Sequence, residues 1–412
     1  KAFDYVGMPE GRFHLAQACI YLSTSPKSNS VFAFFDAIST IRKEESNGIP
    51  NPLKDPSRDG KGLGHGEGYL YPHSYSEHWV AQQYLPKNLQ GKLFYQPSEQ
   101  GFEASIKKKV DQNREAQLAA SFSQNSSETS GNYNYWEVRS LNSSGELLGG
   151  IRNHLTEWSN LTKNSLALII NAGDGLILGE FLRRISNETI YAIVESSEEK
   201  HFIKSLFEKP GSGIIPNVLV DKNFNPESFK IENLCFENIV GRNVLMKQSK
   251  KNIFLSKLKK FISKKSCLVF GESVPSMGQR LSELIPDKLL DLEIRKLLIS
   301  AEEEIYNNSN NFLSEWSPST LKKELELNDW KIHRWEIKEF ITPTLIRKKQ
   351  IKNWFSLQNG SAQKSYGQEL SKYFSSKEIE ELCNTFNNSI GEKVVPWKST
   401  SLFMKLSLKE NS

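Results

Sequence analysis

A pair of glycines follows an apolar run in the second half of the chain. Residues 166–175 read LALIINAGDG, and helical spacing resumes beyond Gly173 and Gly175. Glycines at such a turn let backbone N–H groups approach a bound cofactor, but they also let a strand turn into a helix with no ligand present. Both interpretations stay open. Neither involves an ATP triphosphate, because no lysine or hydroxyl follows the turn and no G-x-x-x-x-G-K-[ST] sequence occurs in the chain.

Two further side chains in this half, a thiol and a carboxylate, are of types that act as nucleophiles, acids or bases. Cys267 stands inside an apolar run, where a buried and inert thiol is expected rather than a nucleophile. Glu272 ends the same run, at the edge of a parallel sheet where active sites usually lie, and is a candidate acid or base. A lone carboxylate assigns no reaction. The catalytic residues therefore stay unassigned.

The clustered histidines and the C-terminal tryptophans have structural explanations. The histidines lack the i, i+4 spacing of a zinc helix and have no cysteine beside them, so we expect loop packing and no metal. The tryptophans are expected in the core rather than around a pocket. The residues concerned are His65, His73, His78, Trp330, Trp335, Trp354 and Trp397.

The charge balance permits an acidic partner without requiring one. The 53 basic and 48 acidic side chains leave a net charge of +5. Lysines and arginines concentrate at Lys107-Lys108-Lys109, at 250–265 and at Arg347-Lys348-Lys349, as solvated helix faces or as a track for phosphates. No apolar run approaches the roughly 20 residues that span a bilayer. The four widely separated cysteines fit a reducing cytoplasm.

The composition changes between residues 121 and 150, which are rich in Ser, Asn and Gly and are predicted to be a linker. Residues 1–120 have helical periodicity and are predicted to form an all-α domain. Residues 151–412 alternate strand and helix patterns, which predicts a doubly wound α/β domain, with a helical insertion around 288–329 and closing antiparallel strands at 331–340 and 394–408. Five strands are expected at 166–171, 189–195, 217–221, 236–244 and 266–272.

Within the first half, the apolar spacing predicts helices at 11–25 and at 26–46, the second opened by Pro26. We expect them to pair antiparallel around a Phe-rich core. A long Pro- and Gly-rich loop at 49–73, a short helix at 75–86 and a charged helix at 103–119 follow. The string Pro26-Lys27-Ser28-Asn29 either contacts a partner chain or caps a helix locally.

The segment GMPEGRFHLAQACIYLSTSPKSNS, Gly7 to Ser30, resembles the C-terminal domain of the RarA or MgsA replication-associated recombination ATPases, which are AAA+ proteins related to clamp loaders. The similarity continues through IPNPLKD and GHGEGYLYPH to about residue 115. It implies a helical domain that assembles such ATPases, as homotetramers, at stalled replication forks. Fork DNA and single-stranded-DNA-binding protein are the implied partners. ATP would bind only in an ATPase core upstream of this chain, so we expect this chain to be a fragment.

The second half resembles class I S-adenosylmethionine-dependent methyltransferases from about 151 to 408. Asn171 stands where the family's turn has an acidic residue, Gly173 and Gly175 match its first two glycines, and Ile177 replaces the third. Glu195, 22 residues after Gly173, ends the second strand where the family's carboxylate accepts the ribose hydroxyls. The resemblance implies S-adenosylmethionine as cofactor, held by Asn171, Gly173, Gly175 and Glu195. The substitutions at Asn171 and Ile177 point to a degenerate or rearranged site.

Three functions follow from these patterns. The first is an assembly domain of a replication and repair ATPase with a methyltransferase-like appendage. The second is an active methyltransferase with an unknown methyl acceptor. The third is a nucleic-acid-binding module that uses the basic runs.

Overall fold

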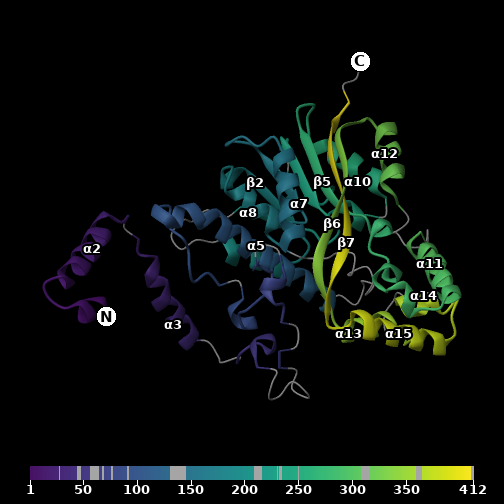
Figure 1. Ribbon diagram of the computed structural model, residues 1–412. Coiled ribbons are helices and arrows are strands. Elements are labelled where there is room, and N and C mark those ends of the chain that lie inside the picture. Colours follow the sequence, from purple (N-terminus) through teal and green to yellow (C-terminus); the bar gives the residue numbers. More distant parts are fainter. Residues whose placement is uncertain are drawn as a thin grey trace.

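The computed structural model shows a helical N-terminal part beside a larger α/β domain (Figure 1). The structure describes residues 1–26, 28–43, 48–55, 65–66, 69–75, 78–90, 92–129, 145–207, 216–229, 231, 234–248, 250–307, 316–358 and 364–409. In these ranges no helix has the length and apolar character needed to cross a membrane.

A seven-stranded sheet organises the α/β domain, in the order β3-β2-β1-β4-β5-β7-β6. The five expected strands form and pair in parallel, because their nearly continuous apolar runs suit a sheet covered on both faces. The predicted antiparallel closure is also confirmed, since β7 runs against both β5 and β6. The strands are β1 Ala167–Ile170, β2 Ile190–Val194, β3 Asn217–Val220, β4 Asn238–Arg242, β5 Cys267–Ser273, β6 Trp330–Ile346 and β7 Lys393–Leu408.

Helices cover both faces of this sheet, as the doubly wound fold requires. On one face, α7 (Gly145–Trp158), α8 (Leu176–Leu182) and α9 (Ser197–Phe207) pack on alternate residues of the strands. On the other face, α10 (Lys251–Leu258) and α12 (Pro318–Leu327) pack on the intervening residues. The α/β fold class predicted from the sequence is therefore confirmed.

A second hydrophobic core lies at the far end of the long β6–β7 ladder. It joins α11 (Leu292–Tyr306) to α13 (Lys348–Trp354), α14 (Tyr366–Leu370) and α15 (Ser376–Ile390). For the part of the chain after β5, the sequence predicted helices only around 288–329, where α11 and α12 lie. The three helices between β6 and β7 were missed. The expected core tryptophans Trp330, Trp354 and Trp397 are buried, and Trp335 is half-buried.

The helices at the N-terminus differ from the prediction. They are α1 (Ala2–Val6), α2 (Gly11–Thr24) and α3 (Ala33–Lys43), and α3 begins after a short 3-10 turn, Ser30–Phe32, rather than at Pro26. The expected Phe-rich core between α2 and α3 is wrong. Their large apolar side chains are exposed instead, because in the described part of the chain little packs against these helices (Figure 1).

The helix α5 (Gly101–Thr129) connects the two halves. It runs through the first residues of the predicted 121–150 linker, and α7 takes up the last ones, while 130–144 lie outside the described residues. The predicted short helix at 75–86 is wrong at its described residues. There the chain is irregular, because residues 80–82 are buried and Ala81 packs with α5 and α7.

The loop before this stretch is irregular as expected at its described residues, with 3-10 turns at Asn51–Leu53 and Pro72–Ser74. The string beginning at Pro26 has local partners: the hydroxyls of Ser28 and Ser30 donate to Glu103 at distances of 2.8 and 2.5 Å. Lys27 lies outside the described residues. These hydrogen bonds attach the connection between α2 and α3 to the first turn of α5.

Candidate functional site

The glycine turn lies at the carboxyl edge of the sheet, between β1 and α8. Asn171 follows β1 with a φ of 60°, and its side-chain amide donates to the carbonyl of Arg242 at 2.8 Å. Gly175 has a φ of 74°, in the left-handed region that favours glycine, and α8 begins at the next residue. Asn171 therefore ties the end of β1 to the end of the neighbouring β4 with the side chain expected to face a cofactor.

A charged pair that the sequence analysis missed crosses this turn. Asp174 is buried, with one carboxylate oxygen accepting from the N–H of Leu176 at 3.0 Å. The other oxygen pairs with the Arg242 guanidinium at 2.5 Å. One oxygen thus caps α8, and the other neutralises the cation at the end of β4.

Glu195 lies where the sequence placed it, at the end of β2, but a lysine holds it. Its Oε1 is 2.5 Å from the Lys247 Nζ, and this ammonium also lies 5.3 Å from the centre of the Phe224 ring. Lys247 comes from a 3-10 turn, Leu245–Lys247, that follows β4. The carboxylate expected to accept ribose hydroxyls therefore has an intramolecular cation on one oxygen.

Glu199, one helical turn further on, occupies the face of Gly173. A β-carbon added to Gly173 would lie 2.3 Å from the Glu199 Oε2. The same oxygen accepts the N–H of Glu195 at 2.6 Å. Burial, followed by the nearby charge of Glu195, raises the pKa of Glu199 to about 6, although the Glu195 N–H and Lys247 act in the opposite direction.

These contacts decide whether the residues fit the implied S-adenosylmethionine. A glycine in such a turn is useful because its bare face admits a ligand. Here the Glu199 carboxylate covers that face of Gly173, Lys247 engages Glu195, and Arg242 engages Asp174. In this arrangement Asn171, Gly173, Gly175 and Glu195 do not form an open cradle for the cofactor.

Two other sequence expectations change in the structure. Ile177, which stands in place of the family's third glycine, has a side chain that is 2% exposed and packs in the core beneath α8. Glu272, the candidate acid or base, is fully buried and accepts the N–H groups of Val244 and Met246 at 3.1 and 2.9 Å. Burial raises its pKa to about 7 despite these bonds. Glu272 fixes the turn that carries Lys247, and is a positioning residue.

Cys267 behaves as predicted. It is buried, and burial raises the pKa of its thiol. Among the histidines, the ring centres of His73 and His78 lie 5.1 Å apart, as do those of Tyr71 and His73. Over the described residues, no group of three or more His, Cys, Asp or Glu side chains gathers in a way that could hold a metal ion.

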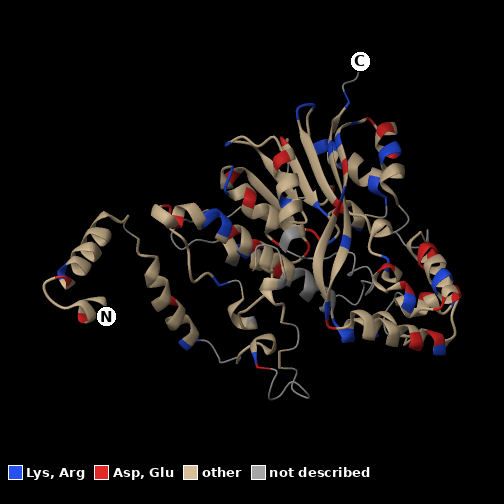
Figure 2. Cartoon of the chain, viewed as in Figure 1, with Lys and Arg blue, Asp and Glu red and all other residues tan. Residues whose placement is uncertain are grey.

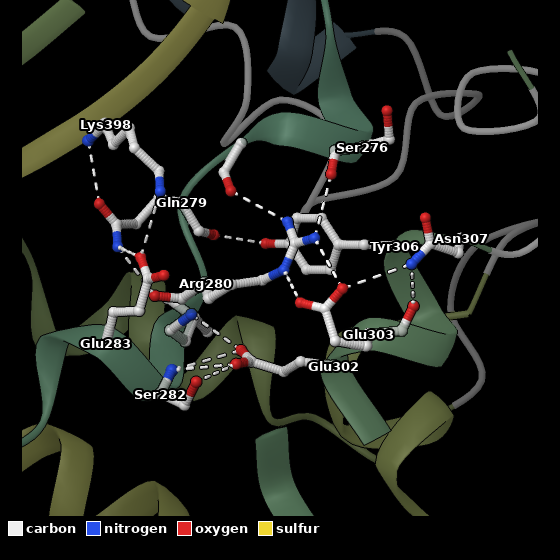
Figure 3. A network of polar contacts seen from close by, with 12 residues as sticks. Ser276, Gln279, Arg280, Ser282, Glu283, Glu302, Glu303, Tyr306, Asn307 and Lys398 are labelled. Atoms are coloured by element: carbon white, nitrogen blue, oxygen red, sulfur yellow. Dashed lines mark hydrogen bonds and ion pairs between the residues drawn. The ribbon is translucent and has the colours of Figure 1, made fainter. Parts of the chain in front are cut away.

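A cavity of about 160 Å³ lies beyond the end of β5, next to the second core. Its polar groups are engaged with one another (Figure 3). Buried Glu302 accepts from the N–H of Leu281 and from the Tyr366 hydroxyl, each at 2.8 Å, and Arg280 pairs with Glu303 at 2.7 Å. The Arg280 guanidinium also lies 3.8 Å from the centre of the Tyr306 ring. This network connects α11 to the segment after β5 and directs no unpaired buried group toward a ligand.

Comparison with known proteins identifies the N-terminal segment. Residues 1–114 match the family model described as MgsA AAA+ ATPase C terminal. The resemblance to the RarA and MgsA ATPases is confirmed for this segment. We call residues 1–114 the MgsA-like segment.

Three bacterial relatives, each a replication-associated recombination protein A, show the extent of this similarity. The protein of Bacillus subtilis is 44% identical over 111 residues, 26% of each chain. That of Coxiella burnetii is 37% identical over 114 residues, 27% of this chain and 26% of the relative. That of Escherichia coli is 33% identical over 111 residues, 26% of this chain and 25% of the relative. The chain thus spans about a quarter of the length of these relatives.

Solved structures similar to this chain are methyltransferases or proteins of related fold. A methyltransferase of Bacillus halodurans gives a TM-score of 0.38 at 11% identity, covering 64% of this chain and 99% of its own. A methyltransferase of Thiobacillus denitrificans, solved with S-adenosyl-L-homocysteine, gives 0.33 at 9% identity, covering 64% and 91%. We transfer no residue role from either. The strand order described above is what assigns the fold.

The MgsA-like segment ends inside α5, and the buried part of the helix begins there. Glu115, Ala116, Ala119 and Ala120 are buried against α7 and α8. The Glu115 carboxylate pairs with Arg183, the residue after α8, at 2.5 Å and approaches α8 so closely that a β-carbon on Gly179 would clash with it. This junction was not predicted, because the sequence analysis ended the first domain at residue 120.

A second carboxylate completes the junction. Glu180 pairs with Arg183 at 2.7 Å and accepts from Gln112 of α5 at 3.1 Å. Burial would raise its pKa, but the bonds from Arg183, Gln112 and Arg184 prevail and lower it to about 2. Helices α5 and α8 are therefore joined by buried ionic contacts.

Proposed function

We propose that this chain is the C-terminal region of a replication-associated recombination ATPase, and that α2 and α3 assemble its copies. The tetramer, the DNA-dependent ATPase activity of the longer protein, its action in replication and repair at stalled forks and its cytoplasmic location are parts of this proposal. So are the partners that the family implies, fork DNA and single-stranded-DNA-binding protein.

One observation carries the assembly role: the MgsA-like segment exposes large apolar side chains on two neighbouring helices. On α2, Phe13 is 75% exposed and Leu22 is 73% exposed. On α3, Phe34 and Phe35 are each 61% exposed. Exposed large apolar side chains gathered on a few elements are typical of protein interfaces. We assign a second copy of this chain as the partner that covers them.

Light scattering coupled to size-exclusion chromatography tests this assembly. The wild-type chain is expected to elute as an oligomer, and a Leu22→Asp/Phe34→Asp variant as a monomer, because each aspartate would have to be desolvated in the interface. Leu327→Asp is the matched control, since Leu327 is 83% exposed on α12 outside the MgsA-like segment. A monomeric wild-type chain, or an unchanged Leu22→Asp/Phe34→Asp oligomer, contradicts the proposal.

A cofactor-binding methyltransferase is the second candidate function. It is supported by the position of Asn171, Gly173, Gly175 and Glu195 at the carboxyl edge of adjacent strands, where open α/β sheets bind ligands. S-adenosylmethionine would need Glu199 to leave Gly173 and Lys247 to leave Glu195. None of these residues indicates which molecule would accept the methyl group.

Calorimetric titration with S-adenosyl-L-homocysteine tests whether the wild-type chain binds this ligand or whether binding requires the removal of Glu199. If Glu199 alone closes the site, Glu199→Ala binds the ligand and the wild-type chain does not. Glu198→Ala is the matched control, because Glu198 is an exposed carboxylate one residue away. Binding by the wild-type chain would establish that the closed arrangement opens for the cofactor. If neither the wild-type chain nor a variant gives a heat of binding, the glycines serve only the turn between β1 and α8.

A further inference from the structure

The basic runs found in the sequence do not combine into one binding site. Lys107 donates to the carbonyl of Pro97 at 3.0 Å. In the 250–265 run, Lys257 pairs with Glu227 at 2.8 Å and Lys259 with Asp329 at 3.5 Å. The three runs belong to separate elements, so their lysines are spread over the surface (Figure 2).

A different basic group gathers at the opposite edge of the sheet from the glycine turn. We call it the basic corner, and it consists of Lys265, Lys331, His333, Arg334 and Lys405. Lys265 precedes β5, three residues belong to β6, and Lys405 belongs to β7, which lies between those two strands. Figure 2 shows basic residues at this end of β5, beside the C-terminus.

Strand register brings the basic side chains of β6 and β7 onto one face. Arg334 lies directly opposite Lys405, and Lys331 lies directly opposite Ser407, two residues further along β7. A register shift at this point in β6 lets His333 reach the Ser407 hydroxyl, with a distance of 2.7 Å from its Nε2. Burial and the charges of Lys331 and Lys405 lower the pKa of His333. The positive charge of the corner therefore comes from its lysines and Arg334, and the lowered pKa favours the neutral form of His333.

The pairing of Arg334 with Lys405 is unfavourable unless something else compensates. Like charges directly opposite on adjacent strands destabilise a sheet. Arg334 lies 5.5 Å from the centre of the Trp158 ring, and Lys405 donates to the Asn160 side chain at 3.0 Å. In the ranges that the structure describes, neither forms an ion pair with a carboxylate. Glu336, the next same-face carboxylate on β6, lies 3.7 Å from His154 instead.

We propose that the basic corner binds the phosphate backbone of a nucleic acid. Adjacent strands lie about 4.8 Å apart, so the cations reach roughly 10 Å across β5, β7 and β6, wider than a single phosphate. Arginine and lysine together suit successive phosphates, with the guanidinium able to take two hydrogen bonds from one of them. Contacts of this kind read no base sequence.

The surroundings favour a nucleic acid over a lipid surface. The exposed apolar residues of β6, Ile337 and Ile341, are an odd number of positions from Arg334 and so lie on the opposite face of the strand. Among the described residues of β6, no exposed large apolar side chain shares the face of the basic corner, where it could anchor insertion into a bilayer. The corner deepens the proposed function by giving the α/β domain a contact with fork DNA, and it does not depend on the assembly of α2 and α3.

Fluorescence anisotropy with a labelled single-stranded oligonucleotide tests the basic corner in the full chain. An Arg334→Gln/Lys405→Gln variant should bind roughly tenfold more weakly than wild type, and the slope of log K against log salt should fall in magnitude by about 1.4 for two lost contacts. Lys348→Gln/Lys349→Gln is the matched control, because it removes the same charge from exposed positions at the start of α13. The control should keep nearly all of the affinity and slope.

Folding and membrane binding are checked on the same variants. The Arg334→Gln/Lys405→Gln variant lacks the repulsion between these two positions, so the midpoint of its thermal unfolding should be unchanged or higher than that of wild type. A loss of binding by a variant that unfolds in this way does not come from misfolding. Equal losses in the two double variants, or no loss in either, would overturn the proposal. So would binding to phosphatidylserine vesicles with none to the oligonucleotide. If the Arg334→Gln/Lys405→Gln variant loses DNA but still forms oligomers, the corner and the assembly function are both supported. If it keeps DNA binding, only the corner is refuted.

Discussion

The MgsA-like segment and the α/β domain use similar apolar residues in opposite ways. In the sheet, Leu168, Ile169 and Ile170 are fully buried because helices cover both faces. On α2 and α3, leucine and phenylalanine side chains are 61–75% exposed at Phe13, Leu22, Phe34 and Phe35. The α/β domain has its partners within the chain. Among the described residues, little covers the first helices, and the proposed assembly of copies would account for this difference.

The comparison also shows what keeps the two regions together. Residues 115–120, in the middle of α5, are mostly buried against α7 and α8, although its first turns are not. Stability measured on the full chain should therefore report the α/β domain and the α5 junction, and respond little to changes in α2. The following predictions test this, beginning with the largest expected effect.

A matched pair of leucine substitutions tests most directly the difference between the buried α/β domain and the exposed helix α2. Leu178→Ala should lower the free energy of unfolding by about 4 kcal/mol, because the side chain is fully buried in the core under α8 and a cavity would remain. Leu22→Ala, at a side chain 73% exposed on α2, should change it by less than about 0.5 kcal/mol in the monomer. Urea unfolding followed by circular dichroism measures both. Similar losses in the two variants would show that α2 is packed.

The junction between the regions comes next. Glu115→Ala should lower the free energy of unfolding by about 3 kcal/mol, since Arg183 would lose a carboxylate in a buried setting and keep only Glu180. Asp111→Ala, which removes a more exposed carboxylate from the same helix, serves as the control and should cost far less. Equal effects in urea unfolding would mean that the α5 junction contributes nothing specific.

The glycine turn gives a pH dependence confined to the α/β domain. The pKa of Glu199 in the folded chain, about 6, lies above its ordinary value of 4.5, so the folded state holds this proton more tightly. Its contribution is fully present below pH 4.5 and is lost as the pH rises through 6, a change of about 2 kcal/mol.

Glu199→Gln isolates that contribution from other titrating groups. The difference in unfolding free energy between wild type and Glu199→Gln should shift between pH 4.5 and 6 and then level off. Burial raises this pKa most, the charges of Glu195 and Asp174 raise it further, and the Glu195 N–H and the charge of Lys247 lower it. Glu198→Gln should show no such shift, because Glu198 is exposed. A flat difference curve for Glu199→Gln would contradict its burial over Gly173.

The smallest effect is expected at the surface of the α/β domain. Lys257→Ala removes an ion pair with Glu227, whose side chain is 59% exposed. Solvent and salt screen such pairs, so the urea midpoint should not move beyond error. A clear loss of stability would mean that burial is a poor guide to the energetics of this domain.

Local sequence patterns predicted the parallel sheet well for a physical reason. An apolar run such as 166–171 must be covered on both faces, and alternating helical runs supply the cover, so the strands and the layers follow. The resemblance to methyltransferases singled out Gly173, Gly175 and Glu195. They could not give Glu199 or Lys247 as their occupants, because those contacts depend on side-chain packing across α9 and the turn after β4.

Periodicity failed at α2 and α3, whose apolar side chains the described residues leave largely exposed. It identified apolar stripes on α2 and α3, and the prediction joined them to each other for lack of another surface. The basic corner was missed for the reverse reason. Its residues are scattered from Lys265 to Lys405, and only the register of β5, β7 and β6 brings them together.

The continuity of α5 has a mechanical consequence. Its 29 residues correspond to about 43 Å of uninterrupted helix, and the MgsA-like segment ends part-way along it. A helix is stiff along its axis, and α5 is held in its middle turns by Glu115 and the alanines against α8. We therefore expect a displacement of its first turn, where Ser28 and Ser30 hold Glu103, to reach the α/β domain through a continuous helix rather than through a flexible connection.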